Sequence, residues 1–148
     1  MRIAPVTRDQ FATWRRLRGA LYTGLDARFH DEEMGWLFQS KEAASFLAWS
    51  KNGDAIGLLE LSLRNFVDGC IGSPVGYIDG IYVEPSCRGQ GLGPQLIAYA
   101  TDWFRARGCK DMATDAEIEN AAAQDFYRQL GFSERWHVVG FTKSLTRS

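Results

Sequence analysis

The chain has 148 residues, of which 45% are hydrophobic, 24% charged and 13% aromatic, and its net charge is −1. This globular composition excludes a disordered, collagen-like or coiled-coil chain, and the length predicts a single domain over residues 1–148. No apolar run is long enough to cross a membrane, and no secretory signal opens the chain. We therefore expect a soluble, cytoplasmic protein with no membrane partner and, given its charge, no nucleic-acid partner.

Charge is unevenly distributed along the chain. Residues 1–22 sum to +4, residues 23–68 to −4 and residues 69–148 to −1. Four acids of the middle segment lie close together in sequence, namely Asp26, Asp31, Glu32 and Glu33. They admit two interpretations: a site for a cationic ligand, or a solvated helix face with Asp31, Glu32 and Glu33 in the first turn, where the helix dipole favours acids.

Cysteine and histidine are few. The three cysteines, Cys70, Cys87 and Cys109, form no close pair, and the histidines are His30 and His137. The sequence therefore predicts neither a disulfide framework nor a metal site.

The first half of the chain predicts two helices followed by a hairpin. Thr7 and Gln10 form a capping box, so a helix should begin near residue 8 and end near residues 22–24. A shorter helix is expected over residues 31–39. Two apolar runs, residues 44–50 and 55–64, flank Asn52-Gly53, a strong hairpin signal, and should pair as antiparallel strands.

The second half alternates strands with helices. A loop over residues 65–74 leads to a strand at 75–83, a glycine-rich turn, and a helix that has Pro94 in its first turn and Gly108 at its end. A short strand at 112–116, a helix that is capped by Asn120 and closed by Gly131, and a final strand at 136–145 complete the chain. This order predicts an α/β (α+β) mixed sheet with helices on both faces, in which the strands joined by a helix are parallel.

The glycine-rich turn has the chemistry of a phosphate cradle, because glycines let successive N–H groups turn inward at a helix N-terminus. Two familiar cradles do not fit. A P-loop needs Gly-Lys-Ser or Gly-Lys-Thr, which is absent, and the third glycine of a dinucleotide fingerprint is replaced by Pro94 or Leu96.

A third pattern does fit. Arg88-x-x-Gly91-x-Gly93 follows a strand that ends in Val83-x-Pro85, and Asn120-x-x-Ala123-x-x-Phe126-Tyr127-x-x-x-Gly131-Phe132 follows later. Both segments resemble the GNAT superfamily of acetyl-CoA-dependent N-acetyltransferases. The resemblance implies the GNAT fold, a central, mostly antiparallel sheet with a splayed parallel pair, and acetyl-CoA as cosubstrate.

The same resemblance implies roles for individual residues. The Val83 N–H would polarise the thioester carbonyl, Tyr127 would protonate the departing thiolate, and Asn120 would contact the cofactor. Main-chain groups of Ile81, Tyr82 and Val83 would bind the pantetheine arm. The pyrophosphate would lie on Arg88, Gly89, Gln90, Gly91, Leu92, Gly93 and Pro94. From the residues alone, Tyr127 is equally compatible with a core aromatic, and Asn120 with a simple helix cap.

Asp79 and Asp115 are the carboxylates best placed to bind or deprotonate an amine. Asp79 interrupts an apolar strand, where a carboxylate is costly unless it is paired or lines a wet cleft. Asp115 ends the next strand of the parallel pair, where ligands bind in such sheets. A charge at a strand end or edge is the alternative interpretation for each residue.

A narrower resemblance is to the aminoglycoside 6'-N-acetyltransferases of the short, dimeric branch. It is carried by Trp14-Arg15-x-Leu17-Arg18, Asp68-Gly69-Cys70-x-x-Ser73-Pro74, Asp79-Gly80-Ile81-x-Val83 and Met112-Ala113-x-Asp115-x-x-x-Glu119-Asn120. It implies a homodimer that acetylates the drug by direct amine attack and so confers resistance. Substrate would be bound by Tyr22, Phe66, Asp79, Asp115 and Trp136. Tyr22-Thr23 stands where relatives have Trp-Pro, and Trp136 where they offer a carboxylate.

Two alternatives stay open from the sequence. One is a GNAT enzyme for another small amine, a polyamine or a protein N-terminus. The other, of a different class, is a noncatalytic acyl-CoA-binding module, against which Asp79, Asp115 and Tyr127 argue, since such a module has no need of them.

Overall fold

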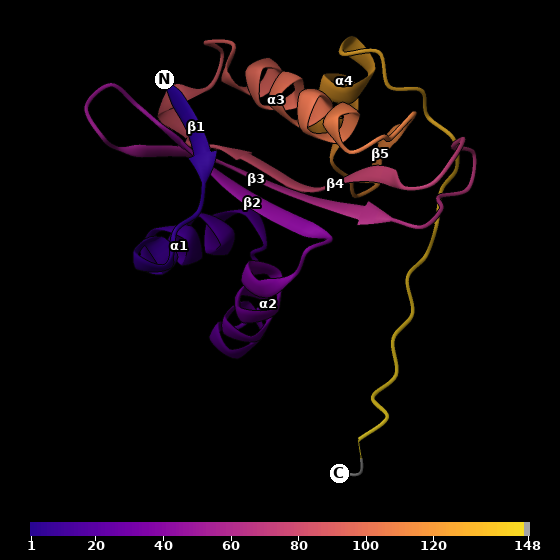
Figure 1. The fold of residues 1–148 in the computed structure, drawn as a ribbon, viewed down its shortest axis with the longest axis horizontal. Helices are drawn as coiled ribbons and strands as arrows, with labels where there is room; N and C mark the ends of the chain where they lie inside the picture. Colours follow the sequence, from indigo (N-terminus) through magenta and orange to yellow (C-terminus); the bar gives the residue numbers. More distant parts are fainter. Residues whose placement is uncertain (147–148) are drawn as a thin grey trace. The chain divides into compact units, whose positions relative to one another are not determined.

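The computed structural model describes residues 1–146. In this range five strands form one mixed sheet, ordered β1-β2-β3-β4-β5 as in the sequence (Figure 1). The strands are β1 (Arg2–Pro5), β2 (Ala43–Trp49), β3 (Ala55–Arg64), β4 (Val75–Val83) and β5 (Met112–Thr114). The first four pair antiparallel, and β4 pairs parallel with β5. The predicted hairpin and the predicted parallel pair are therefore confirmed.

Helices cover both faces of this sheet (Figure 1). The helices α1 (Phe11–Leu21) and α2 (Ala27–Gln39) lie on one face, and α3 (Leu92–Ala106) lies on the other. Two glycines of β4 lie where α3 and α1 come close to the sheet. A Cβ at Gly76 would lie 2.6 Å from Cδ2 of Phe104 in α3, and a Cβ at Gly80 would lie 2.8 Å from Cδ2 of Leu21 in α1. The small residues in this strand thus let helices approach from both sides.

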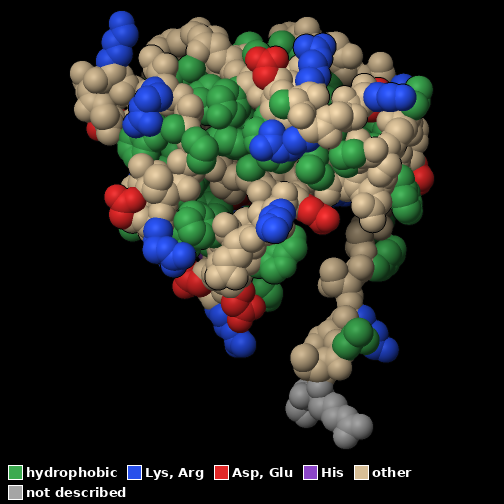
Figure 2. Space-filling view, viewed as in Figure 1, with side chains coloured by type: hydrophobic (Ala, Val, Ile, Leu, Met, Phe, Trp, Pro, Cys, Tyr) green, Lys and Arg blue, Asp and Glu red, His purple; other side chains and the backbone are tan. Residues whose placement is uncertain are grey.

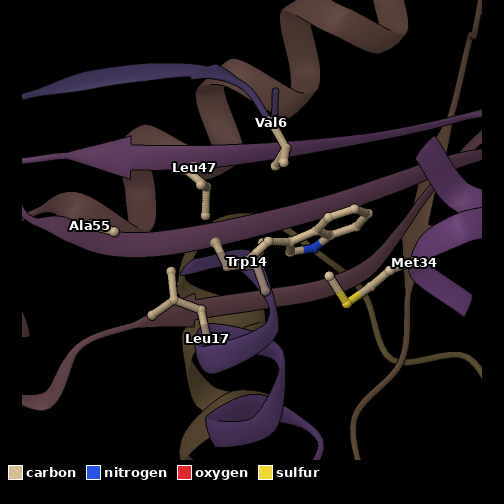
Figure 3. Packing of buried hydrophobic residues seen from close by; sticks show 7 residues of the cluster. Val6, Trp14, Leu17, Met34, Leu47 and Ala55 are labelled. Carbon is tan, nitrogen blue, oxygen red and sulfur yellow. The ribbon is translucent and has the colours of Figure 1, made fainter. Parts of the chain in front are cut away.

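A hydrophobic cluster joins α1 and α2 to the sheet. Trp14 and Leu17, both fully buried, point from α1 toward Leu47 of β2, and Met34 of α2 lies beside the indole (Figure 3). Leu58 of β3 belongs to the same cluster. Burial of such side chains contributes about 1.5–3 kcal/mol each. This cluster fixes α1 over the strands that carry the acidic residues described below.

Asp79 is the extra residue of a β-bulge. Glu60 of β3 pairs with Gly80 and Leu61 pairs with Ile78, so Asp79 has no partner of its own in the ladder. A bulge disturbs the alternation of side chains along a strand. The side chains before and after it, Tyr77 and Tyr82, consequently share the face covered by α1, although they are five positions apart.

Three elements differ from the sequence prediction. The edge strand β1 was not predicted, because it is short and contains Pro5, which is tolerated only at an edge. The second helix begins at Ala27 rather than residue 31, because the Asp26 side chain caps it by accepting from the Phe29 amide at 3.1 Å. The final strand predicted at 136–145 is wrong: residues 136–145 have no regular secondary structure, because none of them pairs with a strand in residues 1–146.

By their internal contacts, Met1–Asp115 and the segment from Ala116 onward form two compact units. The second unit contains α4 (Ala121–Gln129) and an extended tail. As predicted, the Asn120 side chain caps α4 by accepting from the Ala123 amide at 3.0 Å. Gly131, at φ 93°, ends the helix, and the Phe132 amide bonds back to the Tyr127 carbonyl at 3.0 Å in a Schellman arrangement. No helix in residues 1–146 is both long and apolar enough to span a bilayer.

Candidate active site

The glycine-rich turn between β4 and α3 gathers unpaired amide groups. Gly89 and Gly91 adopt φ of 77° and 83°, a left-handed conformation that other residues rarely take. Arg88 fastens the turn to the strand, because its Nε donates to the Val83 carbonyl at 2.9 Å. Within residues 1–146 the amides of residues 89–91 have no backbone acceptor, and the first N–H groups of α3 have none within the helix. This is the donor arrangement that binds a phosphate.

The last part of β4 has an open edge beside this turn. The parallel pairing with β5 covers only Gly76, Tyr77 and Ile78, and no other strand in residues 1–146 pairs with β4 on that side. The Glu84 amide donates to the Ile56 carbonyl on the β3 side. Because backbone groups alternate between the two sides of a strand, the N–H groups of Ile81 and Val83 point to the open edge. An extended amide-bearing molecule can pair there as an additional strand would.

Asp79 and Asp115 belong to one polar cluster. The Arg64 Nη2 lies 3.3 Å from Asp79 Oδ1, and the Arg64 Cζ lies 3.4 Å from the centroid of the Tyr77 ring. The Tyr77 hydroxyl donates to Asp115 Oδ2. The two acids that the sequence singled out are thus connected through Arg64 and Tyr77.

Burial controls the protonation of this cluster. It raises the pKa of Asp79, against the Ser62 hydroxyl and the Arg64 guanidinium, which lower it. Burial also raises the pKa of Tyr77, and the hydrogen bond to Asp115 adds to the increase. The Tyr77 phenol therefore stays protonated at neutral pH and keeps donating to Asp115, while Asp79 takes up a proton more readily than an ordinary aspartate.

A buried ion pair joins Arg18 to Glu60, which lies on β3, the strand next to that of Asp79. Glu60, 3% exposed, accepts from Arg18 Nη1 at 2.7 Å, from Trp14 Nε1 at 2.8 Å and from the Tyr22 hydroxyl at 3.0 Å. Arg18 is 1% exposed and also pairs with Glu33. Burial lowers the pKa of Arg18, but the charge and hydrogen bond of Glu60 outweigh it, and the net shift is upward. The two side chains are therefore bonded to each other and to further partners, as buried polar groups of this kind must be.

The predicted substrate residue Tyr22 turns its hydroxyl inward. Besides Glu60, that hydroxyl lies 3.2 Å from the Asp79 carbonyl, so it links the buried pair to the bulge. Burial, with Glu60 next, raises the pKa of Tyr22. His30 extends the network: its Nδ1 accepts from Arg18 Nε at 3.3 Å, which leaves Nε2 as the protonated nitrogen. That Nε2 is buried and has no hydrogen-bond partner in residues 1–146.

The first-turn interpretation of the middle acids is wrong, because α2 begins at Ala27 and has no acid in its first turn, while the site for a cationic ligand stays a prediction. Asp26 caps α2, Asp31 lies 3.6 Å from Arg15, and Glu32 pairs with Arg28 at 3.2 Å, as a solvated helix face would. Charged side chains of both signs stand out over α2 (Figure 2). Glu32 and Glu33 also line, with Trp36 and Leu37, an open hollow of about 410 Å³.

Three further residues were predicted to belong to the site, namely Phe66, Trp136 and Tyr127. Phe66, in the loop after β3, is 79% exposed, and no hydrogen bond or ring contact within residues 1–146 joins it to the two acids. In the second unit, Trp136 is 47% exposed in the tail. Tyr127 is half-buried on α4, with its ring centroid 5.4 Å from that of Phe126 and 5.3 Å from that of Phe132. The roles given to these three residues stay predictions.

Sequence reasoning did not find Arg64, Tyr77 or Glu60. A signal existed for Tyr77, which is two positions before Asp79 in the same strand and therefore on its side. Glu60 interrupts an apolar strand just as Asp79 does, so the same cost of burying a carboxylate pointed to it. Arg64 ends its strand, where a charge is unremarkable. Among residues 1–146, no three His, Cys, Asp or Glu side chains gather in the manner of a metal site.

Residues 11–132 match the sequence profile of the Acetyltransferase (GNAT) family. The chain belongs to this family. The match covers the glycine turn, both acids and α4, which places the geometry above within an acetyltransferase domain.

Individual relatives and solved structures resemble this chain over nearly its whole length. The aminoglycoside N(6')-acetyltransferase type 1 of Salmonella typhimurium is 37% identical over 97% of this chain and 99% of that protein. The crystal structure of the aminoglycoside antibiotic 6'-N-acetyltransferase AAC(6')-IG from Acinetobacter haemolyticus is 36% identical, with a TM-score of 0.89 over 99% of this chain and 100% of that one. AAC(6')-Iy, solved with the bisubstrate analog CoA-S-monomethyl-acetylneamine, is 35% identical, with a TM-score of 0.88 over 97% of both chains.

The residues present fit the cofactor of this family. The free amides of the turn suit a pyrophosphate, and the open β4 edge suits the amides of a pantetheine arm. The space beside the backbone of Gly89 and Gly91 is open, because a Cβ at either residue would have no atom within 4 Å. The GNAT acetyltransferase thus has both parts of a CoA-type site on consecutive elements, β4 and α3.

Proposed function

We propose that this GNAT protein transfers the acetyl group of acetyl-CoA to the 6'-amino group of aminoglycosides and thereby confers resistance. The observation that carries the proposal is the polar cluster beside the open edge of β4. Asp79 and Asp115 offer two carboxylates for a cationic amine next to backbone donors that suit a thioester cosubstrate. The relatives also support this proposal: proteins named as aminoglycoside 6'-N-acetyltransferases are 35–37% identical to the chain over 97% or more of its length.

The cofactor residues would be those of the turn and the strand end. Acetyl-CoA, when bound, supplies an acetyl group activated as a thioester. The amides from Gly89 to Gly93 would bind its pyrophosphate, with Arg88 holding the turn in place. Main-chain groups of Ile81 and Val83 would pair with its pantetheine arm, and the Val83 N–H would donate to the thioester carbonyl oxygen.

The acids would bind the amine and remove its proton. A primary ammonium must lose a proton before its nitrogen can attack, and Asp79, with its raised pKa, is a better acceptor than an ordinary aspartate. Asp115, which accepts a hydrogen bond from the Tyr77 hydroxyl, would bind a second amino group. Tyr127 stays our candidate for protonating the thiolate, and Asn120 for a contact to the cofactor.

A thiol-release assay tests the reaction. With acetyl-CoA and kanamycin or tobramycin, we expect turnover and a product acetylated at the 6' position, as read by NMR. Background release with these drugs, alongside turnover of a polyamine or a peptide amine, would assign the enzyme to another amine. Calorimetry that shows CoA binding while no amine in the panel is acetylated would identify a noncatalytic module.

We further propose that the active protein is a cytoplasmic homodimer of single-domain subunits. The family match runs from residue 11 to residue 132, across both compact units, which supports one domain. Apolar side chains stand out along the tail (Figure 2): Val138, Val139, Phe141 and Leu145 are 75–93% exposed. Exposed apolar runs of this kind mark an interface. Light scattering should give the mass of a dimer, and the double variant Val139→Ser, Phe141→Ser should give that of a monomer.

A further inference from the structure

The backbone of Asp79 has little support from the sheet. The ladder between β3 and β4 passes from Gly80 to Ile78 and skips Asp79, and the parallel pairing with β5 ends at Ile78. The bulge therefore leaves local freedom at the residue whose carboxylate has to meet the amine. A contact from outside the sheet can remove that freedom.

The Tyr22 hydroxyl makes such a contact from the end of α1. It lies 3.2 Å from the Asp79 carbonyl oxygen and 3.0 Å from Oε1 of Glu60, and its single proton can be donated to either oxygen. A Cβ at Gly80 would overlap the hydroxyl oxygen, so the phenol also packs directly on the backbone of the next residue. The hydroxyl thus touches two consecutive residues of the bulge.

The Tyr22 side chain is itself held in place from the side of α1. The Arg18 guanidinium lies over the ring, with its Cζ 4.9 Å from the ring centroid, and Arg18 is bonded to the same Glu60 that accepts from the phenol. Arg18 and Glu60 are 1% and 3% exposed, so both partners of the phenol are packed inside the protein. A ring that is fixed in this way can fix the backbone that its hydroxyl touches.

We propose that Tyr22 is a positioning residue: its hydroxyl holds the backbone of the bulge and so orients the Asp79 carboxylate toward the substrate amine. This inference rests on the function proposed above. It replaces the role in direct drug binding that the sequence predicts for Tyr22. Both acceptors of the phenol proton, the Glu60 carboxylate and the Asp79 carbonyl, belong to the protein, so that proton is already engaged before any sugar arrives.

A double-mutant cycle of Tyr22→Phe and Asp79→Asn tests the inference, because phenylalanine keeps the ring and removes only the hydroxyl. We would measure the dissociation constant of tobramycin for the four proteins by calorimetry at pH 7.5. With Asp79 present, Tyr22→Phe should weaken binding about three- to tenfold, the ratio that corresponds to one hydrogen bond, because the drug must then fix the bulge itself. In the Asp79→Asn background the same change should alter the constant by less than about twofold, because Tyr22 acts through Asp79.

A second readout does not depend on any drug. In the free protein, hydrogen exchange followed by NMR should be faster at the Asp79 and Gly80 amides of Tyr22→Phe than in the parent, by about three- to tenfold. The amides of β2 should keep their parent rates, which shows that the fold is intact. Tyr99→Phe is the matched control, because Tyr99 is a half-buried tyrosine on α3, on the other face of the sheet (Figure 1), and it should change neither exchange nor binding.

Any of three results would overturn the inference. Equal weakening by Tyr22→Phe in both backgrounds would make Tyr22 a residue that contacts the drug itself. Unchanged binding with Asp79 present, or unchanged exchange at the bulge, would show that the hydroxyl does not position this acid. If the parent protein neither binds nor acetylates an aminoglycoside, the proposed function fails instead, and the exchange rates in the free protein still decide whether Tyr22 holds the bulge.

Discussion

Replacing Glu60 by glutamine should destabilise the protein more than any change at a surface acid. The substitution keeps the size of the side chain but removes the negative charge that pairs with Arg18, whose exposure is 1%. It also places an amide donor opposite the N–H of Trp14 or the hydroxyl of Tyr22, which both donate to this carboxylate. Of its two acidic partners, Arg18 would keep only Glu33, whose side chain is 51% exposed.

The magnitude follows from these partners. Removing one member of a buried ion pair costs about 3–5 kcal/mol, and the surviving contact to Glu33 favours the lower end, about 3 kcal/mol. For a chain of 148 residues this lowers the melting temperature by roughly 6–12 °C, at about 2–4 °C per kcal/mol. Urea unfolding should give the same free-energy difference with an unchanged m-value.

Glu32→Gln is the matched control. Glu32 is 65% exposed and pairs with Arg28 across one helical turn, so its replacement should change the unfolding free energy by less than about 0.5 kcal/mol. If Glu60→Gln melted within about 2 °C of the parent, a difference below about 1 kcal/mol, the buried pair would not stabilise the fold and the reasoning would be refuted.

Three further predictions follow the same logic. Gly76→Ala should lower the free energy of unfolding by at least about 1–3 kcal/mol, because its Cβ would overlap the Phe104 ring. Gly35→Ala, in open space on α2, should raise it by up to about 1 kcal/mol, so thermal melts should show a lower melting temperature for the first variant and a higher one for the second. Asn120→Ala should weaken α4 by about 1 kcal/mol and speed hydrogen exchange at the Ala123 amide, and equal protection in the two proteins would contradict the cap. Burial raises the pKa of Asp79, and an ammonium binds the ionised carboxylate, so aminoglycoside affinity should decline on acidification at a higher pH than for an ordinary aspartate. Calorimetry over a range of pH measures this decline, and Asp79→Asn should abolish it.

Local signals were enough to predict most elements. The capping box at Thr7, the Asn52-Gly53 turn and the cap at Asn120 act within a few residues, so their effects can be read from the sequence, and the strands at 55–64 and 75–83 begin and end as predicted. The glycine turn and the two acids could be predicted as site residues for the same reason: conformational freedom and the cost of a buried charge belong to single residues.

Pairings between distant segments had to come from the tertiary structure. Whether Glu60 meets Arg18, 42 positions away, depends on how α1 packs on β3, which no local pattern encodes. The bulge at Asp79 depends on the register between β3 and β4, and a shift of one residue there changes which side chains share a face. The tail shows the same dependence, because residues 136–145 contain several apolar side chains but become a strand only when another strand completes their hydrogen bonds.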